Sequence, residues 1–141
     1  MTKYETYNAL KDKEINRIED LVGLIPIKIS VVRDSEEEVR IYFTETVYAR
    51  LHHVQDCCEH VTIEDICGDL DDLIGSPLVI AEERVNQERE SDNDDSYGCD
   101  SETWTFYEFA TQKGSVTIRW YGTSNGYYSE RAQFDMVDLT N

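Results

Sequence analysis

The chain has 141 residues, and its 13 Lys and Arg stand against 30 Asp and Glu, which gives a formal net charge of −17. This length suits one domain over residues 1–141, and a hydrophobic content of 40% is too high for a disordered chain. The charge argues against direct binding to nucleic acid or to an anionic membrane surface, because both need clustered Lys and Arg. It suits a basic protein partner instead.

The N-terminal part of the chain shows no targeting signal. Residues 1–20 are charged throughout, and no stretch reaches the roughly 18 apolar residues of a membrane span. We therefore expect a cytoplasmic protein, and a monomer. In that compartment the four cysteines should be reduced thiols: Cys57, Cys58, Cys67 and Cys99.

The predicted elements are mostly strands. Residues 10–22 fit a helix face loosely, with a strand over 14–20 as the alternative, and residues 25–32 and 39–47 are rich in β-formers. Residues 68–74 predict a short helix, because acidic residues stand near its start and Gly75 and Pro77 follow it. Residues 78–85 and 103–111 predict two further strands. The polar stretch between them, about residues 88–101, predicts an acidic mobile loop.

The C-terminal part contains a strong turn signal. Residues 116–121 and 127–137 flank Asn125-Gly126, and both of these residue types tolerate positive φ. We predict a β-hairpin over residues 115–137. The fold class expected is α+β and β-rich: a single domain with a twisted antiparallel sheet, a C-terminal hairpin and one or two short helices.

The negative charge is concentrated in the middle of the chain. Residues 51–110 carry 17 acidic and 2 basic residues, whereas residues 1–50 carry 10 acidic and 8 basic ones, and residues 111–141 carry 3 of each. The middle segment therefore has a net charge of −15 and the flanking segments are nearly neutral.

The same segment holds three of the four cysteines and all three histidines, within residues 52–67. Thiolate and imidazole are the natural ligands of zinc, so we predict a structural Zn²⁺ site. No C-x-x-C pair supports it. Two alternatives stay open: the cysteines are small buried hydrophobes, or one is a catalytic thiol with a His base, which the nearby carboxylates disfavour. The predicted zinc ligands are His53, Cys57, Cys58 and Cys67.

Carboxylates within and after the segment EDICGDLDD predict an acidic face for a basic protein groove. A solvated face that keeps the protein soluble is the alternative; a calcium site lacks the EF-hand order, and a pair of catalytic carboxylates is neither supported nor excluded. Aromatic residues beside Asn125-Gly126 add possible anchors, since Tyr is enriched at interfaces, while most aromatics should serve the core and cross-strand pairs. The predicted partner-binding residues are Asp69, Asp71, Asp72, Glu82, Glu83, Tyr127 and Tyr128.

Two long segments carry a resemblance. HVQDCCEHVTIEDICGDLDDLIGSPLVIAEE (residues 53–83) and WTFYEFATQKGSVTIRWYGTSNGYYSE (residues 104–130) resemble a family of small acidic proteins encoded by bacteriophages and prophages. The resemblance covers about residues 13–135. Its pattern includes His53, Asp56, Cys57 and Cys58, but not His52, His60, Cys67 or Cys99, which weakens any claim that the latter are essential ligands.

The chain is also similar to phage anti-CRISPR proteins of the type II-A class, which inhibit Cas9. This resemblance implies a non-enzymatic protein that binds Cas9 stoichiometrically and keeps target DNA from loading. The acidic middle segment fits such a partner, because Cas9 holds nucleic acid in positively charged channels. The alternatives are a phage accessory protein that binds another host protein, and a zinc- or thiol-dependent enzyme. We expect the protein to act in the cytoplasm of the infected host.

Overall fold

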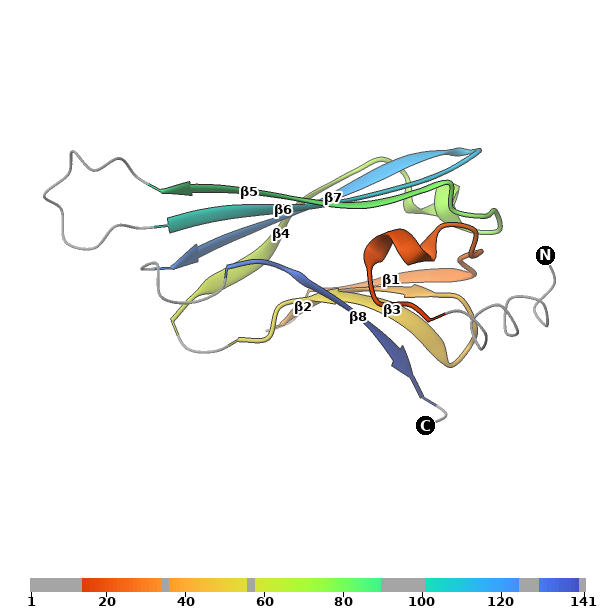
Figure 1. Cartoon of the computed structure of the whole chain (residues 1–141), viewed down its shortest axis with the longest axis horizontal. Helices are drawn as coiled ribbons and strands as arrows, with labels where there is room; N and C mark the ends of the chain where they lie inside the picture. Colours follow the sequence, from red (N-terminus) through yellow and green to blue (C-terminus); the bar gives the residue numbers. More distant parts are fainter. Residues whose placement is uncertain (1–13, 34–35, 56–57, 90–100, 125–129, 140–141) are drawn as a thin grey trace, which may run out of the picture.

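Two four-stranded sheets face each other in the computed structural model and form a β-sandwich (Figure 1). The structure describes residues 14–33, 36–55, 58–89, 101–124 and 130–139, with the backbone alone at 87–89. All strand pairs among these residues are antiparallel. The predicted β-rich antiparallel fold is confirmed, and it has two sheets rather than one.

Sheet A has the strand order β1-β2-β3-β8 and consists of β1 (Lys28–Arg33), β2 (Glu37–Tyr42), β3 (Val47–His52) and β8 (Gln133–Asp138). The single strand predicted over residues 39–47 is wrong, because the chain turns between β2 and β3. Thr44 Oγ1 holds this turn by accepting hydrogen bonds from the N–H groups of Thr46, at 3.2 Å, and Val47, at 2.9 Å. A threonine side chain can replace a backbone acceptor in a turn. Because threonine is also a β-former, the composition of residues 39–47 did not reveal the turn.

Sheet B has the strand order β4-β7-β6-β5 and consists of β4 (His60–Cys67), β5 (Ile80–Arg89), β6 (Ser101–Thr111) and β7 (Gly114–Ser124). The strands predicted over residues 78–85 and 103–111 are confirmed as β5 and β6. Arg89 pairs with Ser101, so the two strands stay in register up to residues 90–100. The predicted acidic mobile loop itself lies outside the described residues.

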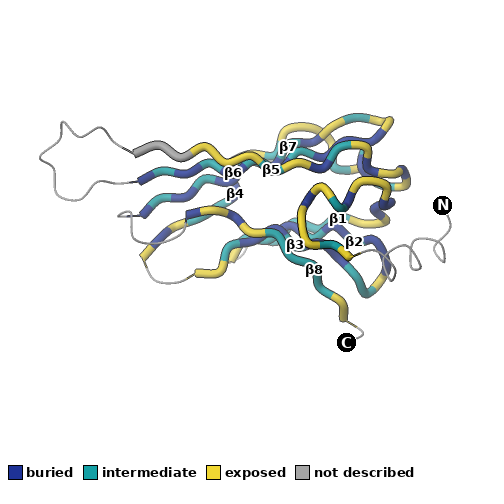
Figure 2. Tube along the Cα trace, viewed as in Figure 1, coloured by how far each residue is buried: buried dark blue, intermediate teal, exposed yellow. Residues whose placement is uncertain are grey.

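The core lies between the two sheets. Side chains alternate along each strand, and those on the two inner faces form one hydrophobic cluster. Figure 2 shows buried positions along the strands of both sheets. Its fully buried members come from both sheets: Val39, Ile41 and Leu51 from sheet A, and Tyr107, Ile118 and Trp120 from sheet B. Both sheets therefore depend on the same core for stability.

Helical structure is limited to two four-residue 3₁₀ turns, η1 (Ile18–Leu21) and η2 (Leu70–Leu73). The short helix predicted over residues 68–74 is confirmed as η2, whose start is capped by the Asp69 carboxylate accepting from the Asp71 N–H at 3.0 Å. The helix predicted over 10–22 is reduced to η1 in its described part. Neither described turn is long enough to cross a membrane.

The predicted hairpin over residues 115–137 is wrong. β7 lies in sheet B and β8 in sheet A, where β8 pairs with β3. The physical reason is that β4 and β6 already occupy the two edges of β7, so β8 has no edge of β7 to pair with. Asn125-Gly126 lies outside the described residues.

Candidate functional site

At one end of the sandwich the chain crosses from one sheet to the other twice, after β3 and again before β8. His53 connects these two crossings. Its Nδ1 lies 2.9 Å from the carbonyl oxygen of Arg131 and its Nε2 lies 3.0 Å from Glu59 Oε2. The side chains of His53 and Glu59 are only 4% and 1% exposed. His53 therefore connects the segment that follows β3 to the segment that precedes β8.

The hydrogen bonds of His53 determine where its protons lie. A carbonyl oxygen only accepts, so Nδ1 must carry a hydrogen toward Arg131. On the other side of the ring, Nε2 faces the Glu59 carboxyl. Gln55 Nε2 donates to the other Glu59 oxygen at 3.1 Å. Both ring nitrogens are thus engaged, and a metal ion at His53 would have to displace one of these partners.

The predicted zinc ligands are only partly accounted for. Cys67 ends β4, seven residues after His60, which places it about 23 Å from the His53 end of the strand. Cys57 lies outside the described residues. No group of three or more metal-binding side chains occurs within the described part of the chain. The full set of four ligands is not assembled around His53, and the zinc site stays a prediction.

The redox state of Cys58 differs from the expectation, whereas that of Cys67 agrees with it. Cys58 is disulfide-bonded, with its partner outside the described residues, while Cys67 is a free, exposed thiol. The expectation of four reduced thiols rested on the compartment alone. An oxidised sulfur has no thiolate to offer a metal. At Cys67, a hydrogen bond to Asp65 raises the pKa of the thiol, which disfavours a catalytic thiolate.

A second buried carboxylate holds the crossover segment, which we define as residues 130–132. Glu130 is 4% exposed, and its two oxygens accept hydrogen bonds from Thr103 Oγ1, at 2.8 Å, and from Ser124 Oγ. The next residues are also fixed, since the Ala132 N–H donates to Thr105 Oγ1 at 3.2 Å. This end of the sandwich is thus rigidly cross-linked by polar side chains.

The five predicted partner-binding carboxylates do not form one face. Asp69, which caps η2, and Asp71, within η2, are exposed at the end of sheet B near the turn between β6 and β7, and Asp72 of η2 is half-buried there. Glu82 is exposed on the outer face of β5. Glu83 points the other way, because neighbouring side chains alternate along a strand.

Glu83 takes part in an internal contact instead. It binds Arg131 Nη2 at 2.6 Å and lies near the buried hydroxyl of Tyr107. Burial, reinforced by the charge of Glu83, raises the pKa of Tyr107. Glu83 and Arg131 also line a pocket of about 580 Å³ between η1, β5 and β8. Glu83 therefore serves this inner edge rather than an outer acidic face.

The aromatic anchors predicted at Tyr127 and Tyr128 lie outside the described residues. The structure shows other aromatic side chains on a surface, namely Trp104 and Phe106 of β6 and Tyr121 of β7. They are half-buried on the outer face of sheet B, and the rings of Trp104 and Tyr121 are 5.2 Å apart. The sequence contained a signal for them. Aromatic residues stand at both even and odd positions within residues 104–109, so an extended β6 presents aromatic side chains on both of its faces.

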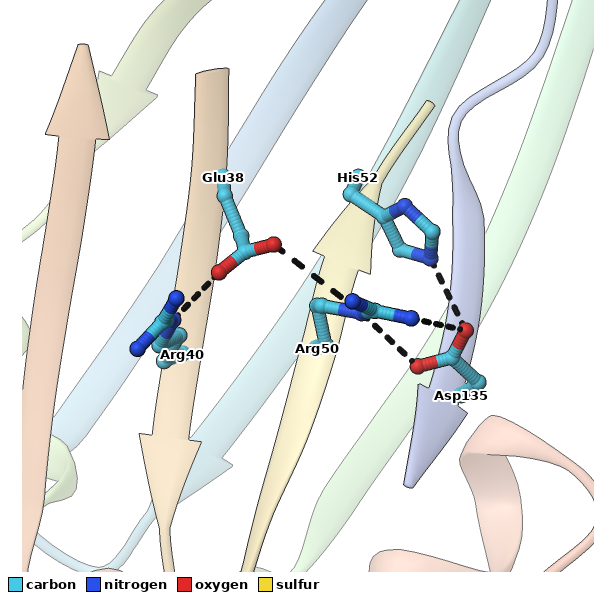
Figure 3. Close-up of polar contacts among 5 residues, drawn as sticks. All are labelled: Glu38, Arg40, Arg50, His52 and Asp135. Atoms are coloured by element: carbon cyan, nitrogen blue, oxygen red, sulfur yellow. Dashed lines mark hydrogen bonds and ion pairs between the residues drawn. The ribbon is translucent and has the colours of Figure 1, made fainter. Parts of the chain in front are cut away.

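The outer face of sheet A carries a chain of ion pairs, drawn in Figure 3. Arg50 binds both oxygens of Asp135, at 3.0 and 2.9 Å, and His52 Nε2 lies 2.9 Å from the same carboxylate. Glu38 continues the chain to Arg40 and, at 3.9 Å, to Arg50. Although burial alone raises it, the hydrogen bonds from Arg50 and His52 hold the pKa of Asp135 below its usual range. These cross-strand pairs join β2, β3 and β8, and the sequence pattern did not reveal them.

The fold defines the class as an antiparallel β-sandwich with short 3₁₀ turns. The chain belongs to the family described as a domain of unknown function, DUF7448, whose model matches residues 8–134. No curated protein and no solved structure matches the chain significantly.

Proposed function

We propose that the protein is a phage anti-CRISPR protein that binds Cas9 stoichiometrically, without enzymatic activity, in the cytoplasm of the infected host. The observation that supports this most is the placement of exposed carboxylates around sheet B. They occur on both of its edge strands and at the end between them: Glu64 and Asp65 on β4, Asp69 and Asp71 at the start of η2, and Glu82 on β5.

This arrangement suits a positively charged protein surface. Residues 60–89 carry eight carboxylates against two arginines. Cas9 holds its heteroduplex and the displaced strand in positively charged channels. Carboxylates around one sheet attract such a channel at long range and compete there with phosphates, so DNA loading is blocked.

The direct test is target cleavage by guide-loaded Cas9, assayed on a panel of type II-A enzymes with the protein in tenfold excess. We expect at least one enzyme to be inhibited, with a titration endpoint near one protein per Cas9. Inhibition should weaken as salt rises, because exposed charges are screened. Undiminished cleavage across the panel contradicts the proposal.

Charge reversal locates the effect. The double variant Asp71→Lys, Glu82→Lys should bind Cas9 at least tenfold more weakly, because it replaces attraction by repulsion. The matched control is the double variant Glu14→Lys, Glu19→Lys, which reverses two exposed carboxylates on and just before η1 and so changes the net charge by the same amount. Equal loss in both would mean that only net charge matters. A pull-down from host lysate that returns another host protein and no Cas9 would favour the accessory-protein alternative.

A structural Zn²⁺ is a separate part of this proposal, supported by the His and Cys residues within residues 52–67. Because a structural metal site contributes to folding, zinc should copurify with protein made without a His-tag and reduced under mild conditions. A zinc content below about a tenth of an equivalent per chain contradicts the structural zinc site.

A further inference from the structure

The outer face of sheet B has an aromatic centre. Trp104 and Phe106 point away from the core, because Tyr107 and Phe109 of the same strand are fully buried on the other side. Tyr121 lies opposite Trp104 on β7. In Figure 1 no described element lies over this face. These three side chains therefore add little to the core, although they bury surface against one another.

Two arginines flank the aromatic centre. The strand register places Arg84 of β5 on one side of Phe106 and Arg119 of β7 on the other. The Arg84 guanidinium carbon lies 6.0 Å from the centre of the Phe106 ring, and the two arginine side chains are 60% and 39% exposed. Trp, Tyr and Arg are the residues that most often dominate binding energy at protein interfaces.

The surroundings of the aromatic centre are acidic. Glu82 lies directly opposite Glu108, a pairing of like charges that costs stability in a sheet. Arg84 approaches Glu108 only to 3.8 Å. On the far side, Glu64 and Asp65 of β4 both neighbour Arg119, at 2.7 and 4.0 Å. The polar rim thus has more carboxylates than arginines, and a partner that supplies cations would relieve the repulsion.

The face also has a hollow. A shallow pocket of about 320 Å³ lies beside Phe106, lined by Arg84, Val85, Asn86 and Phe106. It can receive a side chain of a partner at the edge of the aromatic centre. An extended Lys or Arg side chain fits the site chemically, with its stem against Phe106 and its charge toward the carboxylates.

We infer that the outer face of sheet B, centred on Trp104, Phe106 and Tyr121, is the docking surface for a basic protein partner. This inference rests on the proposed function and assigns the contact to this face rather than to residues 69–83 alone. The acidic rim would repel a second copy of this chain, and it would repel nucleic acid as well.

Binding to guide-loaded Cas9 tests the inference. The Cas9 used is one from the panel that the wild-type protein binds. Trp104→Ala and Phe106→Ala should each weaken binding at least tenfold. Tyr42→Ala is the matched control, since Tyr42 is a half-buried aromatic on the outer face of sheet A. Circular dichroism and thermal melting show whether each variant is folded.

A second pair of variants avoids any loss of aromatic contact. Asn86 is exposed and lies opposite Trp104. With a basic partner, Asn86→Arg should weaken binding several-fold, whereas Asn86→Asp should leave it unchanged or tighter. The opposite order overturns the inference.

The outcomes separate the two claims. Wild-type protein that binds no Cas9 contradicts the proposed function, and with it the partner assigned here. Wild-type protein that binds, together with folded Trp104→Ala and Phe106→Ala variants of unchanged affinity, overturns only this docking surface. Light scattering that shows a dimer of the wild type and a monomer of Trp104→Ala also overturns it, because the occupant would then be a second copy.

Discussion

At the scale of single residues, the contact between His53 and Glu59 is a closely constrained polar feature. Both side chains are almost completely buried, and neither can turn to water when its partner is lost. A buried polar group left without a partner costs more than the hydrogen bond itself contributes. The contact therefore couples the segment after β3 to the start of β4.

A double-mutant cycle measures this coupling. His53→Ala and Glu59→Ala should each lower the free energy of unfolding by about 1–3 kcal/mol. The double variant should lose clearly less than the sum, because each single variant leaves a buried atom of the other side chain, His53 Nε2 or Glu59 Oε2, without its partner. Chemical denaturation gives the three values. Strict additivity would show that the two side chains do not depend on each other.

Asp135 predicts a pH dependence. Its pKa in the folded state lies below that of the unfolded chain, about 3.9 for an ordinary Asp. The ionised carboxylate therefore stabilises the fold above that pH, and the contribution is lost as pH falls through the lower folded-state pKa.

Asp135→Asn should thus lower the free energy of unfolding at pH 7 by about 0.5–1 kcal/mol, a small value because the side chain is partly exposed. The difference from wild type should shrink toward zero in acid, as measured by urea denaturation at several pH values. The control Glu19→Gln, on η1, should show little difference at any pH. A difference for Asp135→Asn that persists unchanged in acid would contradict the ion pair.

At the scale of elements, the crossover segment depends on the absence of a side chain at Gly122 of β7. A Cβ atom there would lie 2.9 Å from Glu130 Cβ and closer still to the Glu130 carbonyl oxygen. The backbone of residue 130 cannot move easily, because its side chain is fixed by Thr103 and Ser124. Close packing of β7 against the crossover therefore requires glycine.

Gly122→Ala should lower the free energy of unfolding by about 1–3 kcal/mol, the usual cost of overpacking. Gly114→Ala is the control, since its Cβ would meet only the flexible Asp72 carboxylate, at 2.7 Å. Thermal and chemical denaturation compare the two. A Gly122→Ala variant as stable as the Gly114→Ala variant would show that the crossover segment moves to make room for the added methyl group.

At the scale of the whole molecule, the net charge of −17 acts on stability as well as on binding. Exposed carboxylates around sheet B repel one another, and salt screens that repulsion. Raising NaCl from about 20 to about 300 mM, which shortens the screening length several-fold, should therefore raise the Tm by a few degrees.

The neutralised variant Asp71→Asn, Glu82→Gln should show a smaller rise in Tm over the same salt range, because two of the repelling charges are gone. Differential scanning calorimetry measures both proteins. A Tm that falls with salt would mean that ion pairs such as Arg50–Asp135 outweigh the repulsion.

Several of the strands were predictable from the sequence. Alternation in residues 103–111 and β-formers in residues 25–32 depend on local side-chain preference, which acts whatever the partner strand is. The short helix over residues 68–74 was predictable for a similar reason, since acidic residues near its start and Gly75 and Pro77 after it are local signals.

The functional residues were less predictable. The predicted ligand Cys67 and the residue His53 are close in sequence, yet they lie at opposite ends of β4, since an extended strand separates residues quickly. Trp104 and Arg119 are distant in sequence and share one face, because β6 and β7 pair. No local pattern carries such proximity.

The sequence alone determined that the protein is acidic, that its charge lies in residues 51–110, and that it folds mainly as antiparallel strands. Charge, side-chain preference and alternation are properties of residues and their neighbours. Only the tertiary structure decided that β7 and β8 belong to different sheets, which face of β5 meets the core, and that Trp104, Phe106 and Tyr121 share one outer face. Those facts depend on which strand edges are free to pair and on which sheet faces pack against each other. Segments that are distant in the sequence determine both.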